Sequence, residues 1–448
     1  MTSTEPSGHN LGYSVKGFLR RSASAATIRL AGILCVFGLQ VLLARLLGDT
    51  EEYGKYAWGQ TLLFMVGMLA CIGLPVITNR FIASLSALQN ESAIMAVIHR
   101  ARTLLLRSSS IVLLIAGIVM LLWPKAAAGE GYRELAILAL LLAPGVTFLT
   151  LYKDICRARQ WLVLALLPMQ VLRPIVTAAL AIACWYALGN KLSGAFALGL
   201  AGLSMYIVLL PQVFLYHRGQ NHLSGSTLTS SAEYSPEQLL PTALPVFVTR
   251  IAGLTVTYSN VLLLGVLVGP GAAGTYFAAE RLASLATIPK LMVSQVNQQS
   301  MAASYATGNR RELQLLAVQS AHGSLWPTLV ASIVLFVFGD DVLQIFGAEY
   351  ASDYAVLCLL AVGAIMNVIA GPAQDILIMT GGQKSIPPVM IAAAALHIAV
   401  ICILVPLYGA IGAALATISS AILAQFWLMR LAKKHVNIST TIFGKLAD

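Results

Sequence analysis

Thr27-Ile-Arg-Leu-Ala-Gly32 opens one long apolar stretch of the sequence, and Val248-Thr-Arg-Ile-Ala-Gly253 opens another one 221 residues later. Each copy continues through an apolar run to a Gly-x-Tyr triplet, which begins at Gly54 in the first copy and at Gly274 in the second. Self-similarity at a nearly fixed offset indicates a duplicated unit. Two membrane-embedded repeats with a substrate path between them are a common design of secondary transporters.

The composition indicates a membrane protein. Mean hydropathy is +0.81, and of the 448 residues 58% are hydrophobic and only 10% are charged. A soluble chain of this length needs more polar surface. Runs of about 17 to 25 apolar residues are long enough to cross a bilayer. Such runs predict twelve transmembrane helices, at residues 26–47, 56–77, 107–124, 134–152, 161–186, 192–216, 241–268, 272–296, 320–338, 352–380, 385–407 and 410–430.

We therefore expect an all-α, polytopic membrane protein of two six-helix lobes. The N-terminal lobe is predicted over residues 1–216 and the C-terminal lobe over 239–448, joined by a Ser-, Thr- and Gly-rich cytoplasmic linker at 217–238. Because each lobe has an even number of helices, both insert with the same orientation. This relation predicts a pseudo-two-fold axis along the membrane normal.

Lysine and arginine are distributed unevenly between the two predicted sides of the membrane. If the N-terminus is cytoplasmic, 19 of these residues fall in or near cytoplasmic segments and 4 in outside segments. Basic residues are retained on the cytoplasmic side, so both termini are expected there. The net charge of +10 then follows from this asymmetry and from attraction to anionic lipid headgroups, and it needs no nucleic-acid partner.

The predicted loops lack the features of an enzyme. They contain no Walker-type phosphate loop and no cluster of Asp, Glu and His. The six cysteines do not have metal-ligand spacing. We therefore expect no catalytic residues, no metal site and no cofactor.

Ionisable side chains inside predicted spans are costly and usually face a cavity or a partner. Arg250 lies about nine residues, or roughly 13 Å, into its predicted span, too deep for easy snorkelling, and we expect it to face a cavity. Its repeat partner Arg29 is nearer the cytoplasmic end, where a cavity-facing role and a snorkelling anchor are both open. Arg45, near the outer end, is expected to be an interfacial anchor. Arg173 adjoins Pro174, where a kink could open a polar pocket or the guanidinium could pair with a helix carbonyl.

The remaining ionisable residues in the spans are Glu280, Arg281 and Asp375. Glu280 and Arg281 are neighbours and point about 100° apart on a helix, so one is expected to face the central cavity while the other holds the bundle together. Asp375 either balances a basic residue such as Lys384 or takes part in proton coupling. The sequence leaves these alternatives open.

Five stretches in this order resemble a known family. They are Ala44–Gly48 with Glu52–Gly54, Gly274–Leu282, Phe346–Tyr350, Ile376–Gly381 and Val405–Ala416. Together they resemble the polysaccharide-exporting branch of the multidrug/oligosaccharidyl-lipid/polysaccharide flippase superfamily, which includes O-antigen and exopolysaccharide repeat-unit flippases.

The resemblance implies two lobes in a V around a cavity that opens alternately to each side of the bacterial cytoplasmic (inner) membrane. It implies a polyprenyl-pyrophosphate-linked oligosaccharide as the substrate, flipped to the outer leaflet for lipopolysaccharide or exopolysaccharide biosynthesis. A polysaccharide polymerase, chain-length machinery and membrane lipids are the implied partners. Many relatives carry an acid where this chain has Asn260, so an ion-coupling carboxylate is not expected there.

In this family cavity cations are thought to receive the pyrophosphate, and Arg29 and Arg250 match best in place. We also expect Arg173 and Arg281 to bind substrate, and Glu280 and Asp375 to serve ion coupling or structural pairing. A multidrug or small-molecule exporter of the related branch is the first alternative, and a membrane enzyme of polysaccharide assembly is the second.

Overall fold

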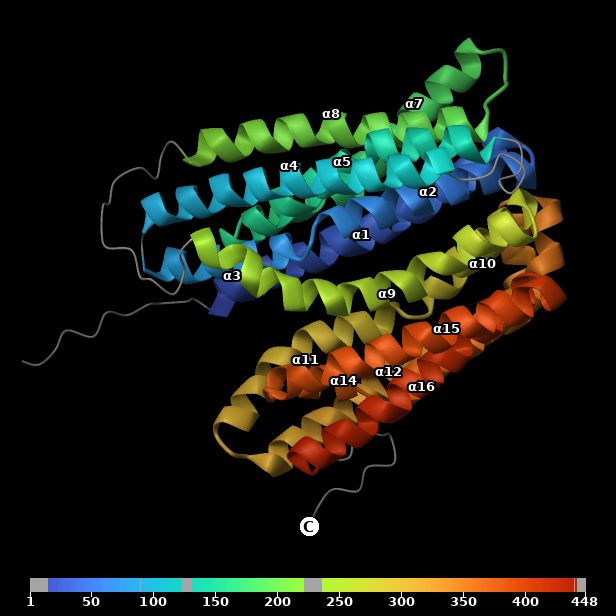
Figure 1. Cartoon of the computed structure of the whole chain (residues 1–448). Coiled ribbons are helices and arrows are strands. Elements are labelled where there is room, and N and C mark those ends of the chain that lie inside the picture. Colours follow the sequence, from blue (N-terminus) through green and yellow to red (C-terminus); the bar gives the residue numbers. More distant parts are fainter. Residues whose placement is uncertain (1–14, 89, 123–130, 221–235, 439, 441–448) are drawn as a thin grey trace, which may run out of the picture.

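The computed structural model describes residues 15–88, 90–122, 131–220, 236–438 and 440, and these residues form long helices in two adjacent bundles (Figure 1). No strand occurs in these ranges. The N-terminal lobe contains α1 (Val15–Leu47), α2 (Thr50–Ala70), α3 (Leu74–Ala87), α4 (Glu91–Leu122), α5 (Tyr132–Ala158), α6 (Leu162–Leu167), the π-helical turn η1 (Pro168–Leu172), α7 (Arg173–Ala187) and α8 (Gly194–Gln220).

The C-terminal lobe begins after the short 3-10 turn η3 (Pro236–Gln238). It contains α9 (Leu239–Leu267), α10 (Pro270–Leu285), α11 (Ile288–Ala306), α12 (Arg310–Gln344), η4 (Ala348–Asp353), α13 (Tyr354–Ile369), α14 (Ala373–Met379), η5 (Gly382–Ser385), α15 (Ile386–Tyr408) and α16 (Ala410–Val436). The linker expected over 217–238 starts later than predicted, because α8 continues to Gln220. Residues 221–235 lie outside the described ranges.

In the described residues each predicted span is mainly helical, but three of the spans, 56–77, 272–296 and 352–380, are broken. The break in 352–380 lies at residues 370–372 between α13 and α14, where Gly371 has a φ of +65°. Within the described ranges ten helices are long and apolar enough to cross a membrane, and the pair α2 and α3, bent by 49°, makes eleven if it is counted as one span. The predicted span 272–296 is divided between α10 and α11. Pro75 and Pro289 stand at the first turns of α3 and α11. Proline is tolerated there but cannot continue a preceding helix, so each break has a local cause.

The two lobes repeat the same helix packing. In the first lobe α2 packs on α5, α3 on α4, α5 on α8, and α7 on α8. In the second lobe α10 packs on α13, α11 on α12, α13 on α16, and α15 on α16. These pairs correspond helix by helix under the sequence repeat. The all-α, two-lobe architecture expected from the sequence is confirmed.

The lobes meet where α2 contacts α10, at the end that carries Asp49 and Glu51. A Cβ on Gly54 would lie 1.7 Å from the carbonyl oxygen of Pro270, and one on Gly274 would lie 2.6 Å from that of Thr50. Only glycine allows this approach, which is a typical use of small residues between membrane helices. The charge asymmetry predicts that this acidic end, called the outer end below, faces outside. The lobes are in contact at this end.

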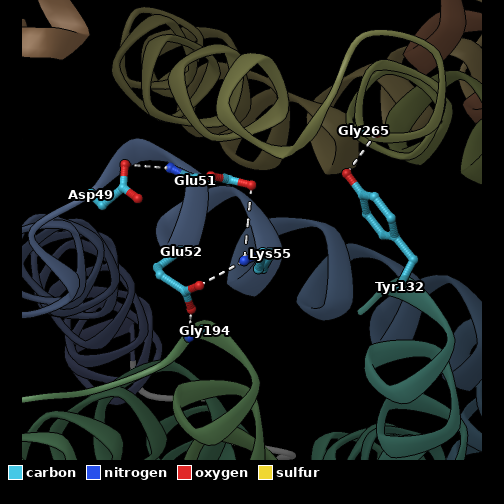
Figure 2. Close-up of polar contacts among 7 residues, drawn as sticks. All are labelled: Asp49, Glu51, Glu52, Lys55, Tyr132, Gly194 and Gly265. Carbon is cyan, nitrogen blue, oxygen red and sulfur yellow. Dashed lines mark hydrogen bonds and ion pairs between the residues drawn. The ribbon is translucent and has the colours of Figure 1, made fainter. Parts of the chain in front are cut away.

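At the outer end, side chains of the N-terminal lobe donate hydrogen bonds to backbone carbonyls of the C-terminal lobe. Arg45 donates from Nε to the Ile345 carbonyl at 2.8 Å and from Nη2 to the Gln344 carbonyl at 2.7 Å. Tyr132 donates to the Gly265 carbonyl at 2.6 Å (Figure 2). Arg45 was expected to be an interfacial anchor, but its guanidinium instead joins the two lobes, because the last turn of α12 presents unpaired carbonyls there.

Candidate functional site

A cavity of about 520 Å³ lies between the lobes. Its N-terminal wall comes from α1, α2, α5 and the α6–η1–α7 segment, and its C-terminal wall comes from α10 and α11. The bundles diverge toward the end opposite α2 and α10 (Figure 1). With the acidic end on the outside, as the charge asymmetry predicts, this arrangement would be inward-facing.

Five basic side chains line this cavity, and no carboxylate is among its described lining residues. They are Arg29, Lys153, Arg157, Arg173 and Arg281. Arg157 is exposed, whereas only 6% of Arg173 is accessible. The positive charge therefore extends from the solvent-accessible rim to the buried interior.

Arg173 is the deepest of these cations. It follows the π-helical turn η1, which begins at Pro168, and it precedes Pro174. Its Cζ atom lies 5.1 Å from the centroid of the Phe64 ring, and its buried Nε has no hydrogen-bond partner in the described chain. A buried guanidinium without a counter-charge costs several kcal/mol. Such an arrangement is expected where an anion completes the site.

Arg281 supplies the C-terminal wall of the cavity. Its Cζ atom is 4.3 Å from the Phe277 ring centroid, a cation–π distance, and its Nε is also buried without a partner among the described residues. No ion pair within the described ranges involves Arg29, Arg173 or Arg281. Each lobe thus contributes a guanidinium that is free to bind an anion.

Arg29 reaches the cavity because α1 packs closely on η1. A Cβ on Gly32 would lie only 2.7 Å from Cβ of Gln170, so glycine permits this contact. Arg29 precedes Gly32 by three residues and shares its helix face. The side chain of Arg29 lines the cavity, as the cavity-facing alternative predicts.

Arg250, which was expected to face the central cavity, is not among the lining residues of that cavity. Its side chain is exposed. The neighbouring Gly253 has nothing within 4 Å of a hypothetical Cβ. α9 packs against α2 and α3 of the N-terminal lobe as well as against α15. α1 packs mainly within its own lobe, so the equivalent faces of α1 and α9 have different neighbours.

The two acidic candidates also lie outside the lining of the central cavity. Glu280 is half-buried on α10 beside Arg281. Asp375 lines a smaller cavity within the C-terminal lobe, where its carboxylate accepts hydrogen bonds from Ser294 and Gln298 on α11. No described ion pair joins Asp375 to Lys384, so structural pairing of Asp375 occurs through α11.

Sequence reasoning missed Lys153 and Arg157 as cavity residues. Both were counted only as basic residues that set the orientation of the chain. Their spacing of four places them on one face of the last turns of α5. This spacing could have identified them as residues of one surface. The same end of α5 thus carries basic residues that predict the orientation in the membrane and that line the cavity.

The arrangement can hold a polyanion. Guanidinium groups bind phosphate oxygens in bidentate fashion, and a lysine adds a mobile point charge. In the described part of the chain no three His, Cys, Asp or Glu residues come together as a metal site. The cavity lining offers positive charge and hydrogen-bond donors to a ligand.

Solved transporter structures share this fold over nearly the whole chain. A multidrug resistance MATE family transporter of the MOP superfamily in an inward-facing conformation matches with a TM-score of 0.73 and 17% identity, covering 91% of this chain and 99% of its own. An outward-facing transporter of the same description gives 0.64 and 16%, covering 93% and 95%.

A MOP superfamily transporter from Pyrococcus furiosus, described by a reverse polarity of its binding pocket, matches with a TM-score of 0.66 and 15% identity, covering 94% of this chain and 95% of its own. At these identities the likeness concerns the fold. A search of curated proteins finds no match. Residues 18–296 match the model of the family described as polysaccharide biosynthesis protein, and the chain therefore belongs to that family.

Proposed function

We propose that this protein is a flippase, not an enzyme, that carries a polyprenyl-pyrophosphate-linked oligosaccharide from the cytoplasmic to the outer leaflet by alternating access. The observation that carries the proposal is the buried, unpaired guanidinium of Arg173 in a cavity whose described lining is basic and contains no carboxylate. The pyrophosphate would receive hydrogen bonds from Arg173 and Arg281, and Arg29, Lys153 and Arg157 would attract it at the rim.

The barrier that such a protein lowers is the transfer of charge and sugar through about 30 Å of hydrocarbon. Guanidinium groups would replace part of the water around the pyrophosphate, while the sugar occupies the wet space between the lobes. The lipid tail would stay in the bilayer and extend through the gap between lobes. Closure of the inner end and opening of the outer end would then release the headgroup outside.

A multidrug exporter is the alternative, because several solved structures of this fold are multidrug transporters. The positive charge of the cavity lining argues against a cationic drug, since a cluster of basic side chains repels a cation. An anionic amphiphile would fit this alternative better. The two functions differ in whether transport requires a diphosphate.

The location and partners follow from the same proposal. The protein would lie in the bacterial cytoplasmic membrane with both termini inside, and it would deliver substrate to a polysaccharide polymerase and chain-length machinery for O-antigen or exopolysaccharide synthesis. Single cysteines replacing Arg310 and Asp340 in a cysteine-free background test the orientation. The second should react with an impermeant thiol reagent in intact cells and the first should not.

Reconstitution with lipid-linked oligosaccharide extracted from the host tests the function. We expect the purified protein in vesicles to expose a fluorescently labelled lipid-linked oligosaccharide to an external glycosidase. Arg173→Gln should reduce that rate at least tenfold, because the buried donor that receives the pyrophosphate is lost. Export of a cationic dye with no flipping would instead support the multidrug alternative and contradict the proposal.

A further inference from the structure

A cavity of about 460 Å³ lies between the α6–η1 segment and α8 of the N-terminal lobe, and it is called the α8 groove below. α8 lies on the side of this lobe that faces away from the C-terminal lobe (Figure 1). No described residue lines both the α8 groove and the central cavity. Val163, Leu172 and Leu215 of the groove wall are exposed. The groove therefore opens toward the lipid around the lobe and not toward the central cavity.

Two prolines shape the α8 groove, and both lie in its wall. Pro168 stands where α6 passes into the π-helical turn η1, and Pro211 lies inside α8. A proline inside a helix removes a backbone hydrogen bond and bends the helix. The bends at Pro168 and Pro211 account for the space between the two helices, which pack closely elsewhere in this lobe.

Gln212 on α8 is the buried polar side chain of the groove, and only 2% of it is accessible. Because Pro168 has no N–H, it cannot donate to the Leu164 carbonyl four residues earlier. Gln212 donates to that carbonyl instead, from Nε2 at 3.0 Å. This bond fixes the orientation of the amide, since the nitrogen must face the carbonyl. Gln212 Oε1 then has no hydrogen-bond partner in the described part of the chain. A buried acceptor without a donor is costly, so this oxygen is expected to receive a hydrogen bond from a ligand.

The inner end of the groove has the features of a membrane interface. Gln160 and Trp161 line it at the turn between α5 and α6, and tryptophan is enriched at the level of lipid headgroups. On α8, Arg218 follows the lining residue Leu215 by three positions and therefore shares its face. Arg218 is exposed, and none of the ion pairs in the described ranges involves it. A cation at this place attracts an anionic headgroup.

These features discriminate between the lipids that could occupy the groove. Apart from Gln160 and Gln212 its described lining is apolar or aromatic, so the groove accepts a hydrocarbon chain. An isoprenoid tail has no hydrogen-bond donor for Gln212. The ammonium of a zwitterionic headgroup is repelled by Arg218. An anionic phospholipid whose headgroup carries a hydroxyl supplies the chain, the negative phosphate and the O–H donor together.

We propose that the α8 groove binds one phosphatidylglycerol molecule of the inner leaflet, through Arg218, Gln212 and the apolar groove wall. The phosphate would face the Arg218 guanidinium, a headgroup hydroxyl would donate to Gln212 Oε1, and one acyl chain would lie between α6–η1 and α8. Side chains of a helix lean toward its N-terminus, so Arg218 extends from the end of α8 toward Gln212. The proposal does not depend on what the central cavity transports.

The bound lipid would support the segment that lines the central cavity. Leu167 and Leu172 face the α8 groove, whereas Met169 and Arg173 of the same segment face the central cavity. A π-helical turn is a weak point of a helix and has few internal constraints. A lipid packed against its outer side would hold η1, and with it the following Arg173, in place.

Native mass spectrometry of the purified full-length protein in detergent tests the site, with phosphatidylglycerol and phosphatidylethanolamine of identical acyl chains as probes. We expect the wild type to retain one phosphatidylglycerol with about tenfold higher affinity than phosphatidylethanolamine. Leu215→Trp, which fills the groove, and Arg218→Gln should each lower the affinity for phosphatidylglycerol about tenfold. Leu210→Trp, at an exposed position of α8 outside the groove lining, and Arg430→Gln, at an exposed arginine near the end of α16, are the matched controls and should bind as the wild type does.

A second comparison tests the contact with Gln212. Phosphatidylethanol has the same charge as phosphatidylglycerol but no hydroxyl in its headgroup. The wild type should prefer phosphatidylglycerol about three- to tenfold, whereas Gln212→Leu should bind the two lipids equally, because the acceptor is lost. A merely destabilised fold would lower both affinities and keep the preference.

Several results would overturn the lipid site. They are equal retention of phosphatidylglycerol and phosphatidylethanolamine by the wild type, equal losses in Leu215→Trp and Leu210→Trp, and a headgroup preference that persists in Gln212→Leu. Loss of farnesyl diphosphate binding in Leu215→Trp, with phosphatidylglycerol still retained, would assign the groove to an isoprenoid tail and would also contradict the proposal.

Discussion

Two pairs of repeat-related residues behave in opposite ways. Gly54 and Gly274 face each other at the outer contact, and each is pressed against backbone of the other lobe. Arg29 and Arg250 stand at equivalent places in the repeated hexapeptide, yet only Arg29 lines the central cavity. The repeat is therefore preserved where the lobes meet and lost where ligand would bind.

The difference has a local cause. Gly32 brings α1 against the π-helical turn η1, whereas Gly253 has open space around it. α15, the counterpart of the α6–η1–α7 segment, is an uninterrupted helix over Ile386–Tyr408. A duplicated sequence thus sets the framework, and the interrupted helix of the first copy adds Arg173 to the cationic cavity.

The largest expected difference is between Arg29→Ala and Arg250→Ala. Removal of a charge-assisted hydrogen bond costs on the order of 1.5 to 3 kcal/mol, so Arg29→Ala should lower polysaccharide export about ten- to a hundredfold. Arg250→Ala should stay within about twofold of the wild type, since a surface change away from a site has little effect. Export at matched membrane abundance is the measurement, and equal losses in the two variants would show that both arginines serve the path.

The glycine pair should respond symmetrically. Gly54→Ala and Gly274→Ala both place a methyl group against opposing backbone, so both should open the outer end and slow export by about tenfold. Phe37, which lines the cavity and packs edge-on against Phe346, can report this opening when replaced by cysteine.

External labelling of that cysteine by an impermeant thiol reagent should become faster in both glycine variants. Gly38→Ala, whose added methyl meets nothing within 4 Å, is the control and should label as slowly as the parent. A response to only one of the two glycine substitutions would argue that the outer contact is not symmetric.

The smallest effect is expected for the glycines of the hexapeptide. Gly32→Ala forces the added methyl toward Gln170, which should lower the melting temperature of the detergent-purified protein by a few degrees. Gly253→Ala has room for the methyl and gains helix propensity of up to about 1 kcal/mol, so its melting temperature should be unchanged or higher. The opposite order would mean that α1 does not depend on close packing against η1.

Hydropathy predicted the helices well, because a chain that must satisfy its backbone in lipid has few alternatives to long helices. It missed the breaks after α2, α10 and α13, since Pro75, Pro289 and Pro372 stand in runs that are apolar or weakly polar overall. The boundary of the linker was also set too early, because the end of α8 is as polar as the segment that follows.

Only part of the candidate site could be predicted from the pattern of apolar and charged residues. Arg173 and Arg281 stand out because a charge inside an apolar run needs a special environment. Lys153 and Arg157 did not, since a helix end explains basic residues without a cavity. The expectation for Arg250 came from the repeat, which predicts a position in the fold but not the neighbours at that position. Asp154 and Asp375 are likewise separated by 221 residues. Of the two, only Asp375 lines the smaller cavity of the C-terminal lobe.

The most direct test of the cationic cavity is the affinity of the purified protein for farnesyl diphosphate, measured by calorimetry at low and high salt. We predict binding that weakens with salt, that exceeds the affinity for farnesyl monophosphate, and that falls about ten- to a hundredfold in Arg173→Gln but stays unchanged in Arg250→Ala. Equal affinity for farnesol and farnesyl diphosphate, or a larger loss in Arg250→Ala than in Arg173→Gln, would contradict the assignment of this cavity as the pyrophosphate site.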